Sequence, residues 1–593
     1  MTEIYLPIVS APEKPPSSTQ KIVIDPITRI EGHLRIEVTV EDGFVTDAWS
    51  SSTMFRGIEM VLIGRDPRDA WVFAQRICGV CTTVHAIASV RTVENALGLT
   101  VPDNARLLRN LIEGAQFIQD HVIHFYHLHA LDWVDLVNAL SADPAATSDL
   151  ARSISDWPNS SPEYFAGVQS RLKTFADSGQ MGLFANGYWG HPAYKLPPEA
   201  NLMAAAHYLE ALGWQREFIK IHALLGGKNP HPQTYLVGGM ALPVDPEGDV
   251  GINPGRITQL KNWSAQALEF VSQVYLPDLM AIASFYPEWA GLGMGVGNYL
   301  AYGDFPTETG GDPASLWLPR GVVMGLNLDA APQPLDQQQI REYVTHSWYT
   351  YNGGDGEAKH PSQGETQPNY TGPTPPFDFL ETDSKYSWLK APRYAVQPME
   401  VGPLARMIVA YAAGHPRVRE EIDRALDALG LGQQALFSTL GRVAARGIET
   451  LVIAEQMGGW IDELEANMKG GNLAIHNGEL WDPDTWPNEA VGWGTTEAPR
   501  GALGHWIRIK DKAIENYQAV VPTTWNGSPR DARGTRGVWE QALIGTPVAD
   551  LEKPVEILRT VHSFDPCMAC AVHVLDAQGR ELTQVLVQGT STC

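Results

Sequence analysis

Near its N-terminus the chain reads Arg76-Ile77-Cys78-Gly79-Val80-Cys81-Thr82-Thr83-Val84-His85, and near its C-terminus it reads Asp565-Pro566-Cys567-Met568-Ala569-Cys570-Ala571-Val572-His573. Each stretch is a Cys-x-x-Cys pair followed by a His. The sequence has 5 cysteines, and the two pairs account for all of them except the last residue, Cys593. Four thiolates brought together from the two ends would form a soft, four-sulfur site that suits a transition metal.

Two ordinary interpretations compete with that one. Structural zinc is the usual meaning of paired Cys-x-x-Cys motifs, but such pairs lie roughly 15–20 residues apart and staple a small domain with little core. A redox disulfide of the thioredoxin type needs one such pair near a βαβ pattern. Here the pairs stand at opposite ends of a chain of 593 residues, which disfavours both interpretations.

Beyond the two motifs, the sequence resembles the large subunit of the nickel-iron hydrogenases over essentially the whole chain, and both motifs match that family residue by residue. The segments Phe125-Tyr126-His127-Leu128-His129-Ala130-Leu131-Asp132-Trp133-Val134-Asp135 and Ala498-Pro499-Arg500-Gly501-Ala502-Leu503-Gly504-His505-Trp506 look like those of the membrane-bound uptake type. This ordered set of motifs is far more specific than a single Cys-x-x-Cys.

The resemblance implies a mainly α fold with small peripheral β-sheets (α+β), built on a central bundle of long helices. It also implies that Cys78 and Cys567 bind nickel terminally, while Cys81 and Cys570 bridge nickel to an iron that carries CO and two cyanide ligands. The implied activity is the reversible oxidation of dihydrogen to protons and electrons, run as uptake. Heterolytic cleavage would pass a proton to a nearby base.

Composition limits the class of protein. A hydrophobic content of 44% and a charged content of 19% indicate a globular chain. The formal net charge of −25 disfavours nucleic acid as a partner, because phosphate contacts need clustered Lys and Arg. No apolar run approaches the roughly 18 residues of a membrane span, and Met1 to Gln20 lacks the basic and apolar regions of a secretory signal.

The N-terminal part predicts a small sheet and holds two acidic candidates. Short β-favouring runs with turn signals between them span residues 21–25, 33–40 and 44–50. Glu31 alone would be an ordinary surface carboxylate at a turn, but the resemblance implies that it lies beside the metal as the first proton carrier, a role that needs burial to tune its pKa. The resemblance also implies that Glu59 binds magnesium near the C-terminal His, and carboxylate oxygen suits that cation.

The first cysteine pair is predicted to lie between two helices. One helix opens at Asp66-Pro67, with an acidic cap and Pro in its first turn, and runs into Cys78. A second helix is predicted to carry Cys81 and His85, four residues apart and therefore on one face. His85 could then donate a hydrogen bond to the Cys81 sulfur and tune that ligand. The alternative is an ordinary surface histidine.

The stretch from Asn104 to Leu140 predicts one long helix without a clear stop. Four histidines within it spread around the helix, so we interpret them as packed, hydrogen-bonded residues and not as a metal site; they are His121, His124, His127 and His129. Asp120 resembles a family carboxylate in the outer shell of the active site.

Residues 196–225 and 254–286 predict two further long helices. The segment between them is rich in Gly and Pro, which indicates a loop, and it holds His231. A loop histidine is usually solvated. The resemblance instead places His231 at the contact with the nearest iron–sulfur cluster of a partner subunit.

Near the C-terminus, residues 506–510 and 516–521 alternate enough to form a hairpin across Asp511-Lys512. Arg500 precedes it and would ordinarily be a solvated turn residue. The resemblance implies that the Arg500 guanidinium lies over the metal pair, with Asp120 and Asp565 in the supporting shell.

The same resemblance implies ligand-binding roles for residues near this hairpin. Pro522 and Thr523 begin a segment that hydrogen-bonds a diatomic ligand on iron, and Pro499 belongs to the same cofactor-binding set. Ala519 stands at the position of a magnesium-binding carbonyl. Because that ligand is a backbone group, its side chain is free to vary.

The chain is predicted to have three parts: a loose arm over residues 1–20, a single catalytic domain over 21–573 and an extension over 574–593. Family large subunits are made as precursors, and a dedicated protease removes the extension after the final His, here His573, once nickel is in. A covalent extension would hold the arm with Cys567 and Cys570 away until then. The alternative is an ordinary tail beyond a finished site.

If the paired cysteines hold the metals, none remains in the mature chain for iron–sulfur clusters, so electrons must leave through another subunit. The resemblance implies an obligate heterodimer with an iron–sulfur small subunit, a membrane cytochrome b as a further partner, a maturation protease and nickel and iron insertion proteins. We expect a peripheral position at the outer, periplasmic face of the cell membrane through the partner subunit. A cytoplasmic, membrane-associated enzyme is the alternative.

Two other classes of protein stay open. The related quinone-reducing respiratory subunits share this fold but lose the cysteines, and this chain keeps all four. A zinc-stapled scaffold protein would need neither Glu31 nor Glu59 nor a removable tail.

Overall fold

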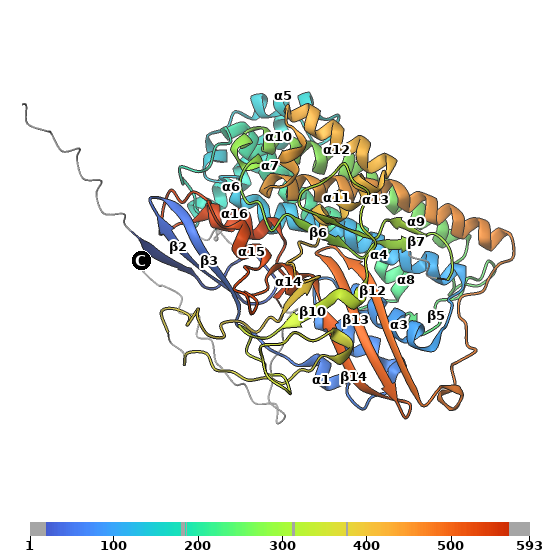
Figure 1. Ribbon diagram of the computed structural model, residues 1–593. Coiled ribbons are helices and arrows are strands. Elements are labelled where there is room, and N and C mark those ends of the chain that lie inside the picture. The colour runs from blue at the N-terminus through green and yellow to red at the C-terminus, as the bar shows by residue number, and fades with distance from the viewer. Residues whose placement is uncertain (1–18, 180–183, 185–186, 311–314, 375–376, 569–593) are drawn as a thin grey trace, which may run out of the picture.

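The computed structural model describes residues 19–179, 184, 187–310, 315–374 and 377–568. Long helices fill the upper part of the molecule in Figure 1, and strands and connecting loops lie below and to the left of them. The mainly α fold with peripheral sheets is therefore confirmed. In the part of the chain so described, no helix is long and apolar enough to cross a bilayer.

The helices are α1 (Ile58–Leu62), α2 (Ala70–Ala74), α3 (Val84–Leu97), α4 (Asp103–Ile123), α5 (Pro144–Ile154), α6 (Pro162–Asp177), α7 (Pro198–Phe218), α8 (Lys220–Gly226), α9 (Pro254–Phe270), α10 (Leu276–Ser284), α11 (Pro403–Ala413), α12 (Pro416–Leu429), α13 (Thr439–Lys469), α14 (Pro522–Asn526), α15 (Val538–Ala542) and α16 (Val555–Ser563). The strands are β1 (Gln20–Ile24), β2 (Leu34–Glu41), β3 (Phe44–Ser52), β4 (Tyr235–Leu236), β5 (Gly239–Met240), β6 (Asn298–Ala301), β7 (Asp304–Pro306), β8 (Leu316–Leu318), β9 (Gly321–Met324), β10 (Ile340–Tyr343), β11 (Ala391–Tyr394), β12 (Glu489–Ala498), β13 (Gly501–Lys510) and β14 (Ala513–Val520).

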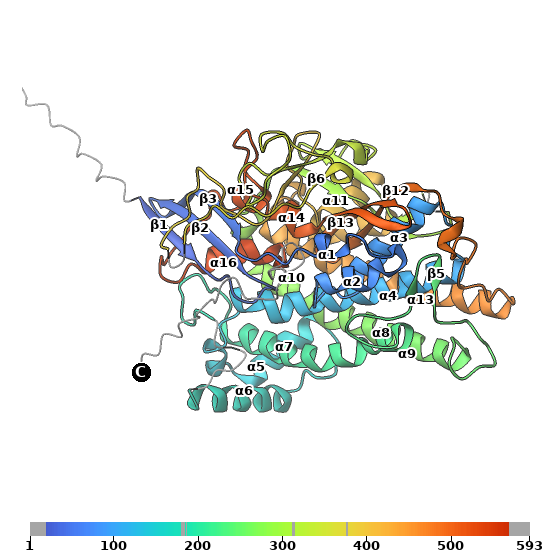
Figure 2. The same ribbon diagram turned by 90° about the horizontal axis from the view of Figure 1, so that it is seen from below.

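Two long helices form the centre of the bundle. α13 packs against α4, α9, α10, α11 and α12, and α4 also contacts α7 and α8 (Figure 2). Residues Asn104 to Val122 of α4 are all buried, as expected for a helix that is covered on every side. Gly114 allows the close approach of α4 and α13, because a Cβ there would lie 2.7 Å from Met457 Sδ and 3.0 Å from Trp460.

The prediction of one helix from Asn104 to Leu140 was wrong at its C-terminal end. α4 ends at Ile123, a π-helical turn follows over His124–His129, and a 3₁₀ turn closes the segment at Asp132. The wider turn redirects polar side chains to other elements: His124 Nε2 lies 2.6 Å from the carbonyl oxygen of His562, for example. Such tertiary hydrogen bonds leave no periodic signal in the sequence, so the end of the helix could not be predicted. A π-turn at a helix end often marks a functional region.

An antiparallel sheet in the order β12-β13-β14 packs on α3. Gly494 permits this approach, since a Cβ there would lie only 2.3 Å from the backbone nitrogen of Thr92. The predicted hairpin across Asp511 and Lys512 is confirmed. Both of these residues have positive φ, 49° and 65°, as a two-residue turn between twisted strands requires.

The predicted N-terminal sheet is also confirmed, with antiparallel order β1-β2-β3. The loop between β1 and β2 then meets the other end of the chain. Glu31 forms a parallel bridge with Cys567, in which Met568 N donates to the Glu31 carbonyl at 2.7 Å and Glu31 N donates to the Pro566 carbonyl at 3.4 Å. Main-chain hydrogen bonds therefore join the two ends of the sequence.

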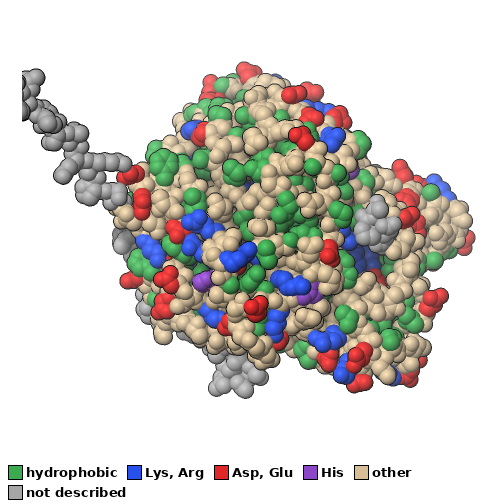
Figure 3. All heavy atoms as spheres, in the orientation of Figure 1, with side chains coloured by type: hydrophobic (Ala, Val, Ile, Leu, Met, Phe, Trp, Pro, Cys, Tyr) green, Lys and Arg blue, Asp and Glu red, His purple; other side chains and the backbone are tan. Residues whose placement is uncertain are grey.

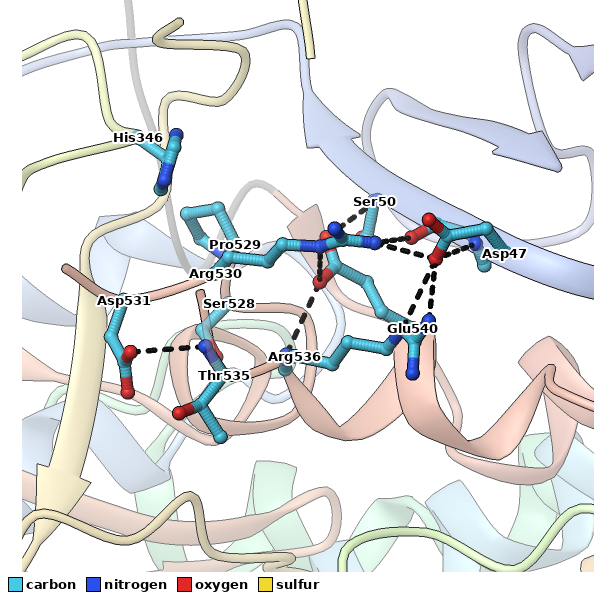
Figure 4. A network of polar contacts seen from close by, with 12 residues as sticks. Asp47, Ser50, His346, Ser528, Pro529, Arg530, Asp531, Thr535, Arg536 and Glu540 are labelled. Atoms are coloured by element: carbon cyan, nitrogen blue, oxygen red, sulfur yellow. Dashed lines mark hydrogen bonds and ion pairs between the residues drawn. The ribbon is translucent and has the colours of Figure 1, made fainter. Parts of the chain in front are cut away.

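A separate polar network (Figure 4) joins the N-terminal sheet to the region around α15. Asp47 on β3 accepts from Arg530 at 2.5 Å and from Arg536 at 2.9 Å. Ser50 N, also on β3, donates to Glu540 on α15 at 3.2 Å. Burial raises the pKa of Glu540 to about 7, so this carboxyl is largely protonated in the folded chain at pH 6, where an exposed glutamate would be ionised.

We predict that Glu540→Gln weakens the pH dependence of stability. A raised pKa in the folded state makes folding more favourable below the unfolded value of 4.5, and this contribution is lost as the pH rises through about 7. Between pH 5 and pH 7.5 the wild-type protein should lose about 2 kcal/mol more of its folding stability than the variant. The melting temperature of the wild-type protein should therefore fall further over this pH range. Glu269→Gln, at an exposed position on α9, should keep the original slope; equal slopes in all three proteins would contradict the assignment.

Candidate metal centre

Three cysteines from the two motifs meet in the interior. The Sγ atoms of Cys78, Cys81 and Cys567 all lie within 4.8 Å of one another, and Cys78 and Cys567 are 3.3 Å apart. All three side chains are buried. Cys570 lies outside the described residues, so three of the four predicted thiols are seen to converge.

A tight turn presents the first pair. Cys78 follows a 3₁₀ turn that ends at Ile77, and its Sγ accepts hydrogen bonds from Val80 N at 3.3 Å and Cys81 N at 3.1 Å. Backbone N–H groups aimed at a sulfur stabilise its thiolate form, which is the form that binds metal.

The prediction that Cys81 and His85 share one face of a helix was wrong. α3 begins at Val84, so Cys81 lies in the preceding turn, where its N–H is bonded to the Cys78 sulfur and not to a helical carbonyl. His85 lies in the first turn of α3, and its Nδ1 is 3.1 Å from Nε2 of His505. Burial lowers the pKa of His85 to about 4, which keeps the ring neutral. Its predicted hydrogen bond to the Cys81 sulfur stays a prediction.

A guanidinium and two carboxyl groups stand beside the sulfurs. Arg500 lies in the turn between β12 and β13, and its two Nη atoms reach Asp120 at 3.4 Å and Asp565 at 3.0 Å. Burial works against the Arg500 cation, but Asp565, Cys567 and Asp120 outweigh it and hold the pKa of Arg500 well above its usual value. The structure thus brings together the three residues that were predicted to form one shell.

Asp120 differs from an ordinary carboxylate. Burial, with the nearby charges of Asp565 and Cys78, raises the pKa of Asp120 to about 8 against the opposing effect of Arg500. Near neutral pH it is therefore mostly a neutral acid that can donate a hydrogen bond. Arg500 then supplies a permanent positive charge beside an anionic thiolate cluster.

A small cavity lies between these groups, lined by Cys81, Val84, His85, Ala498, Arg500, Leu503, Pro522, Thr523 and Cys567. Around it, Arg500 Nε and Asp565 Oδ2 are buried without a hydrogen-bond partner among the described residues. Unpaired buried polar atoms are costly unless a ligand satisfies them. The donor set fits a soft metal group, since thiolate sulfur selects metals such as nickel and iron over calcium or magnesium.

A buried ionic network, which the sequence analysis missed, holds the Arg500 turn. Arg406 on α11 pairs with Glu449 at 2.5 Å and with Glu497 at 2.8 Å. The same guanidinium donates to the carbonyl oxygens of Ala498 and Pro499 at 2.8 Å and 3.0 Å. These bonds fix the backbone that carries Arg500. A buried Arg in a helix gives no sequence pattern that distinguishes it from a surface one.

The second cysteine arm is held from two sides. Thr523, at the start of α14, accepts a hydrogen bond through Oγ1 from Cys567 N at 3.1 Å. Glu31 Oε2 lies 3.3 Å from Cys567 Sγ. The predicted neighbours Glu31 and Thr523 therefore both contact this one cysteine.

Two of the three predicted magnesium ligands, Glu59 and Ala519, are in contact. Glu59 Oε1 accepts from Ala519 N at 2.8 Å, and Thr366 donates to Glu59 Oε2. Lys390 lies nearby through Gln518, to which it donates at 2.9 Å. Thr366 and Lys390 come from segments without a recognisable motif, and sequence reasoning missed them. His573 lies outside the described residues.

His231 is not the solvated loop residue that its context would ordinarily predict. It is half-buried with φ 62°, and its Nε2 lies 2.8 Å from the carbonyl oxygen of Cys78. This contact connects the loop after α8 to the first cysteine turn.

The histidines of the α4 segment make the expected hydrogen bonds to other groups, and His129 also stands with Asp132 and His562 in a cluster of possible metal ligands. His121 pairs with Glu449, His127 lies 3.1 Å from the Tyr208 carbonyl, and His129 lies 3.0 Å from Asp132. Asp132 also pairs with His562 at 2.6 Å and with Arg29 at 2.5 Å. Although burial opposes its ionisation, Arg29 and His562 hold the pKa of Asp132 well below its usual range. This cluster was not foreseen, because Arg29 and His562 are far from His129 and Asp132 in the sequence.

Comparison with known proteins agrees with this geometry. Residues 56–573 match the family described as nickel-dependent hydrogenase. The chain belongs to the nickel-dependent hydrogenase family. Residues 21–51 match a second family description, HoxL-like.

Curated members of this hydrogenase family cover nearly the whole chain. The uptake hydrogenase large subunit of Rhizobium leguminosarum bv. viciae is 54% identical over 587 residues, covering 96% of this chain and 98% of the relative. The hydrogenase-1 large chain of Escherichia coli K12 is 50% identical and covers 96% of this chain and 97% of its own length. The recognition of a hydrogenase large subunit is thereby confirmed.

Solved hydrogenase structures share the fold. The [NiFeSe] hydrogenase of Desulfomicrobium baculatum is 36% identical with a TM-score of 0.73, and that of Desulfovibrio vulgaris Hildenborough is 35% identical with a TM-score of 0.75. Both matches cover 94% of this chain and 100% of the solved chain.

For this hydrogenase we predict that Thr523→Val loosens the second cysteine arm. Valine keeps the shape of threonine but leaves Cys567 N–H buried without its acceptor, at a cost of about 1–3 kcal/mol. The variant should melt at a lower temperature and lose nickel faster to a chelator. Thr524→Val is the matched control, because the Thr524 side chain makes no hydrogen bond to any described residue. Indistinguishable melting and nickel loss in the two variants would refute the role of this bond.

Proposed function

We propose that this chain is the catalytic large subunit of an uptake hydrogenase, which oxidises dihydrogen to two protons and two electrons. The observation that carries the proposal is the burial of Cys78, Cys81 and Cys567 together, beneath Arg500 and beside Glu31. The names of the curated relatives support the uptake direction. A purely structural zinc site would not require a buried cation and a carboxyl group at its sulfurs.

We assign the ligands by combining this geometry with the resemblance. Cys78 and Cys567 would hold nickel, and Cys81 with Cys570 would bridge to an iron that carries CO and two cyanide ligands. When bound, the metal pair supplies the redox centre at which dihydrogen is split heterolytically. Pro499, Arg500, Pro522, Thr523 and His85 would surround the diatomic ligands; Arg500, Pro522, Thr523 and His85 line the small cavity beside the sulfurs.

Proton transfer would begin at the second cysteine arm. The Cys567 sulfur and Glu31 Oε2 are 3.3 Å apart, close enough to pass a proton directly. Arg500 would stabilise negative charge on the sulfurs, and Asp120 and Asp565 would hold its guanidinium in place. Protonated Asp120 would avoid adding a second buried anion beside Arg500.

A magnesium ion near the second arm is a further part of the proposal. Glu59, the carbonyl oxygen of Ala519 and His573 would be its ligands, and the first two offer the oxygen donors that a hard cation prefers. The short distance between Glu59 and Ala519 supports a common site.

We further propose that electrons leave through an iron–sulfur small subunit in an obligate heterodimer. The naming of the relatives as large subunits supports such a partner. His231 would contact the nearest cluster, because it reaches the cysteine turn from a loop. A membrane cytochrome b would accept the electrons, with the complex held at the outer face of the cell membrane and a cytoplasmic, membrane-associated complex as the alternative.

Maturation would remove residues 574–593 after nickel and iron insertion. The family match that ends at His573 supports this boundary. We predict that the large subunit of the active enzyme ends at His573, which intact mass spectrometry checks. An active enzyme that retains Val574 to Cys593 would show that the extension is not a maturation device.

Metal content tests the proposed function. We expect about one nickel and one iron in the large subunit, counted apart from the iron of the partner's clusters, and no zinc in the site. Cys567→Ser replaces a soft ligand by a hard one, so the variant should lose nickel and activity together. Full activity with nickel retained in Cys567→Ser, or zinc in the wild-type protein, would refute the proposal.

Glu31→Gln separates proton transfer from metal binding. Glutamine keeps the size and hydrogen bonding of glutamate but carries no proton at neutral pH. We expect turnover and hydrogen–deuterium exchange to fall by about 100-fold or more, with nickel and iron still bound. Unchanged turnover would assign the proton route to another group.

A further inference from the structure

A second and larger cavity opens away from the metal centre, with a volume of about 380 Å³. That volume is within the usual range for small-molecule pockets. Its walls come from the C-terminal half of α3, the N-terminal half of α4, the segment between β7 and β9, and β12. Basic side chains line it, among them Arg91, Arg106, Arg109 and Arg320. Figure 3 shows Lys and Arg side chains in a hollow at the right of the molecule.

Two of these guanidinium groups converge on one residue. Arg91 Nη1 donates to the carbonyl oxygen of Thr495 at 3.0 Å, and Arg320 Nη2 donates to Thr495 Oγ1 at 3.0 Å. Two like charges are thus held close together on the same wall. Such an arrangement is unfavourable unless anions compensate for it.

Arg91 has its own compensation. It pairs with Asp304 at 2.9 Å and lies 3.8 Å from Glu113. Burial raises the pKa of Glu113 well above its usual value, with Asp304 adding to the effect. Asp304 is therefore the main counter-charge of Arg91.

Arg320 has no ion-pair partner among the described residues, although Asp304 and Glu497 are near enough to favour its charged form. Its Nε donates to the carbonyl oxygen of Tyr302 at 2.6 Å and its Nη2 to Thr495, both neutral groups. Its Nη1 makes no hydrogen bond with the described part of the chain. Burial lowers the pKa of Arg320 despite nearby acidic groups. Arg320 is a partly buried cation whose free N–H groups line an open cavity.

Two further arginines of the pocket are already paired, and Glu308, which also lines the pocket, accepts a hydrogen bond from Ser315 Oγ. Arg109 forms two hydrogen bonds with Glu94, at 2.9 Å and 2.7 Å. Arg106 pairs with Asp103 at 2.7 Å and with Glu463. Neither arginine needs a ligand, and Glu94 is not free to neutralise Arg320.

We propose that this pocket binds a small organic oxyanion, a carboxylate or a phosphate ester, through the guanidinium of Arg320, with Arg91 as the second positive charge. A guanidinium offers paired donors that match both oxyanions. The indole of Trp493 lies 5.5 Å from the guanidinium carbon of Arg320 and gives the pocket an apolar wall for the organic part. Because the whole chain carries a formal charge of −25, attraction of an anion must come from this local cluster.

Titration calorimetry of the purified holoenzyme with inorganic phosphate and with succinate, at constant ionic strength, tests the site. We expect saturable binding of at least one anion, and the stronger of the two tells whether the pocket prefers phosphate or carboxylate. Arg320→Gln should weaken that binding about tenfold or more, the effect of losing charge-assisted hydrogen bonds. Arg424→Gln is the matched control: it removes one positive charge from an exposed position on α12 and should leave binding unchanged.

Absence of saturable binding for both anions would overturn the proposal, and so would binding that Arg320→Gln and Arg424→Gln affect equally. Should Arg320→Gln fail to fold, crystals of the unaltered holoenzyme soaked in selenate provide a second test. Anomalous density within hydrogen-bonding distance of Arg320 would support the site. Selenate density elsewhere but not in this pocket would overturn it.

Discussion

The junction between the two ends of the chain is the contact on which the rest of the structure depends. Glu31 and Cys567 are paired by main-chain hydrogen bonds, and their side chains are 3.3 Å apart. One short bridge therefore joins the loop between β1 and β2 to the second cysteine arm and places a carboxyl group at a sulfur. The helical bundle around it supplies a dry interior in which these electrostatic interactions are strong.

Each buried charged group near the site is held in place by another buried charged group. Arg406 holds the turn that carries Arg500, and Arg500 in turn faces the sulfurs between Asp120 and Asp565. Removing one partner from such a network leaves a buried charge unpaired, which is usually more costly than any single bond suggests. The site is rigid because each charged group that reaches it is itself held by another buried group.

Sequence reasoning placed the residues that carry recognisable chemistry. Three of the four paired cysteines, Glu31 and the Arg500 shell with Asp120 and Asp565 meet as expected, while Cys570 lies outside the described residues. It failed where tertiary contacts override local pattern: the Cys81 N–H bonds to a sulfur, so its segment is a turn and not a helix. It also missed the partners Arg406, Thr366 and Lys390, because a buried polar residue is recognised only by what it contacts in space.

The central claim is that sulfur atoms from both ends of the chain bind nickel. X-ray absorption at the nickel edge of the purified enzyme tests this most directly, because it reports the ligand atoms around nickel. The nickel should show a first shell dominated by about four sulfur atoms, as the count of paired cysteines requires. A nickel shell made mainly of nitrogen and oxygen would contradict it.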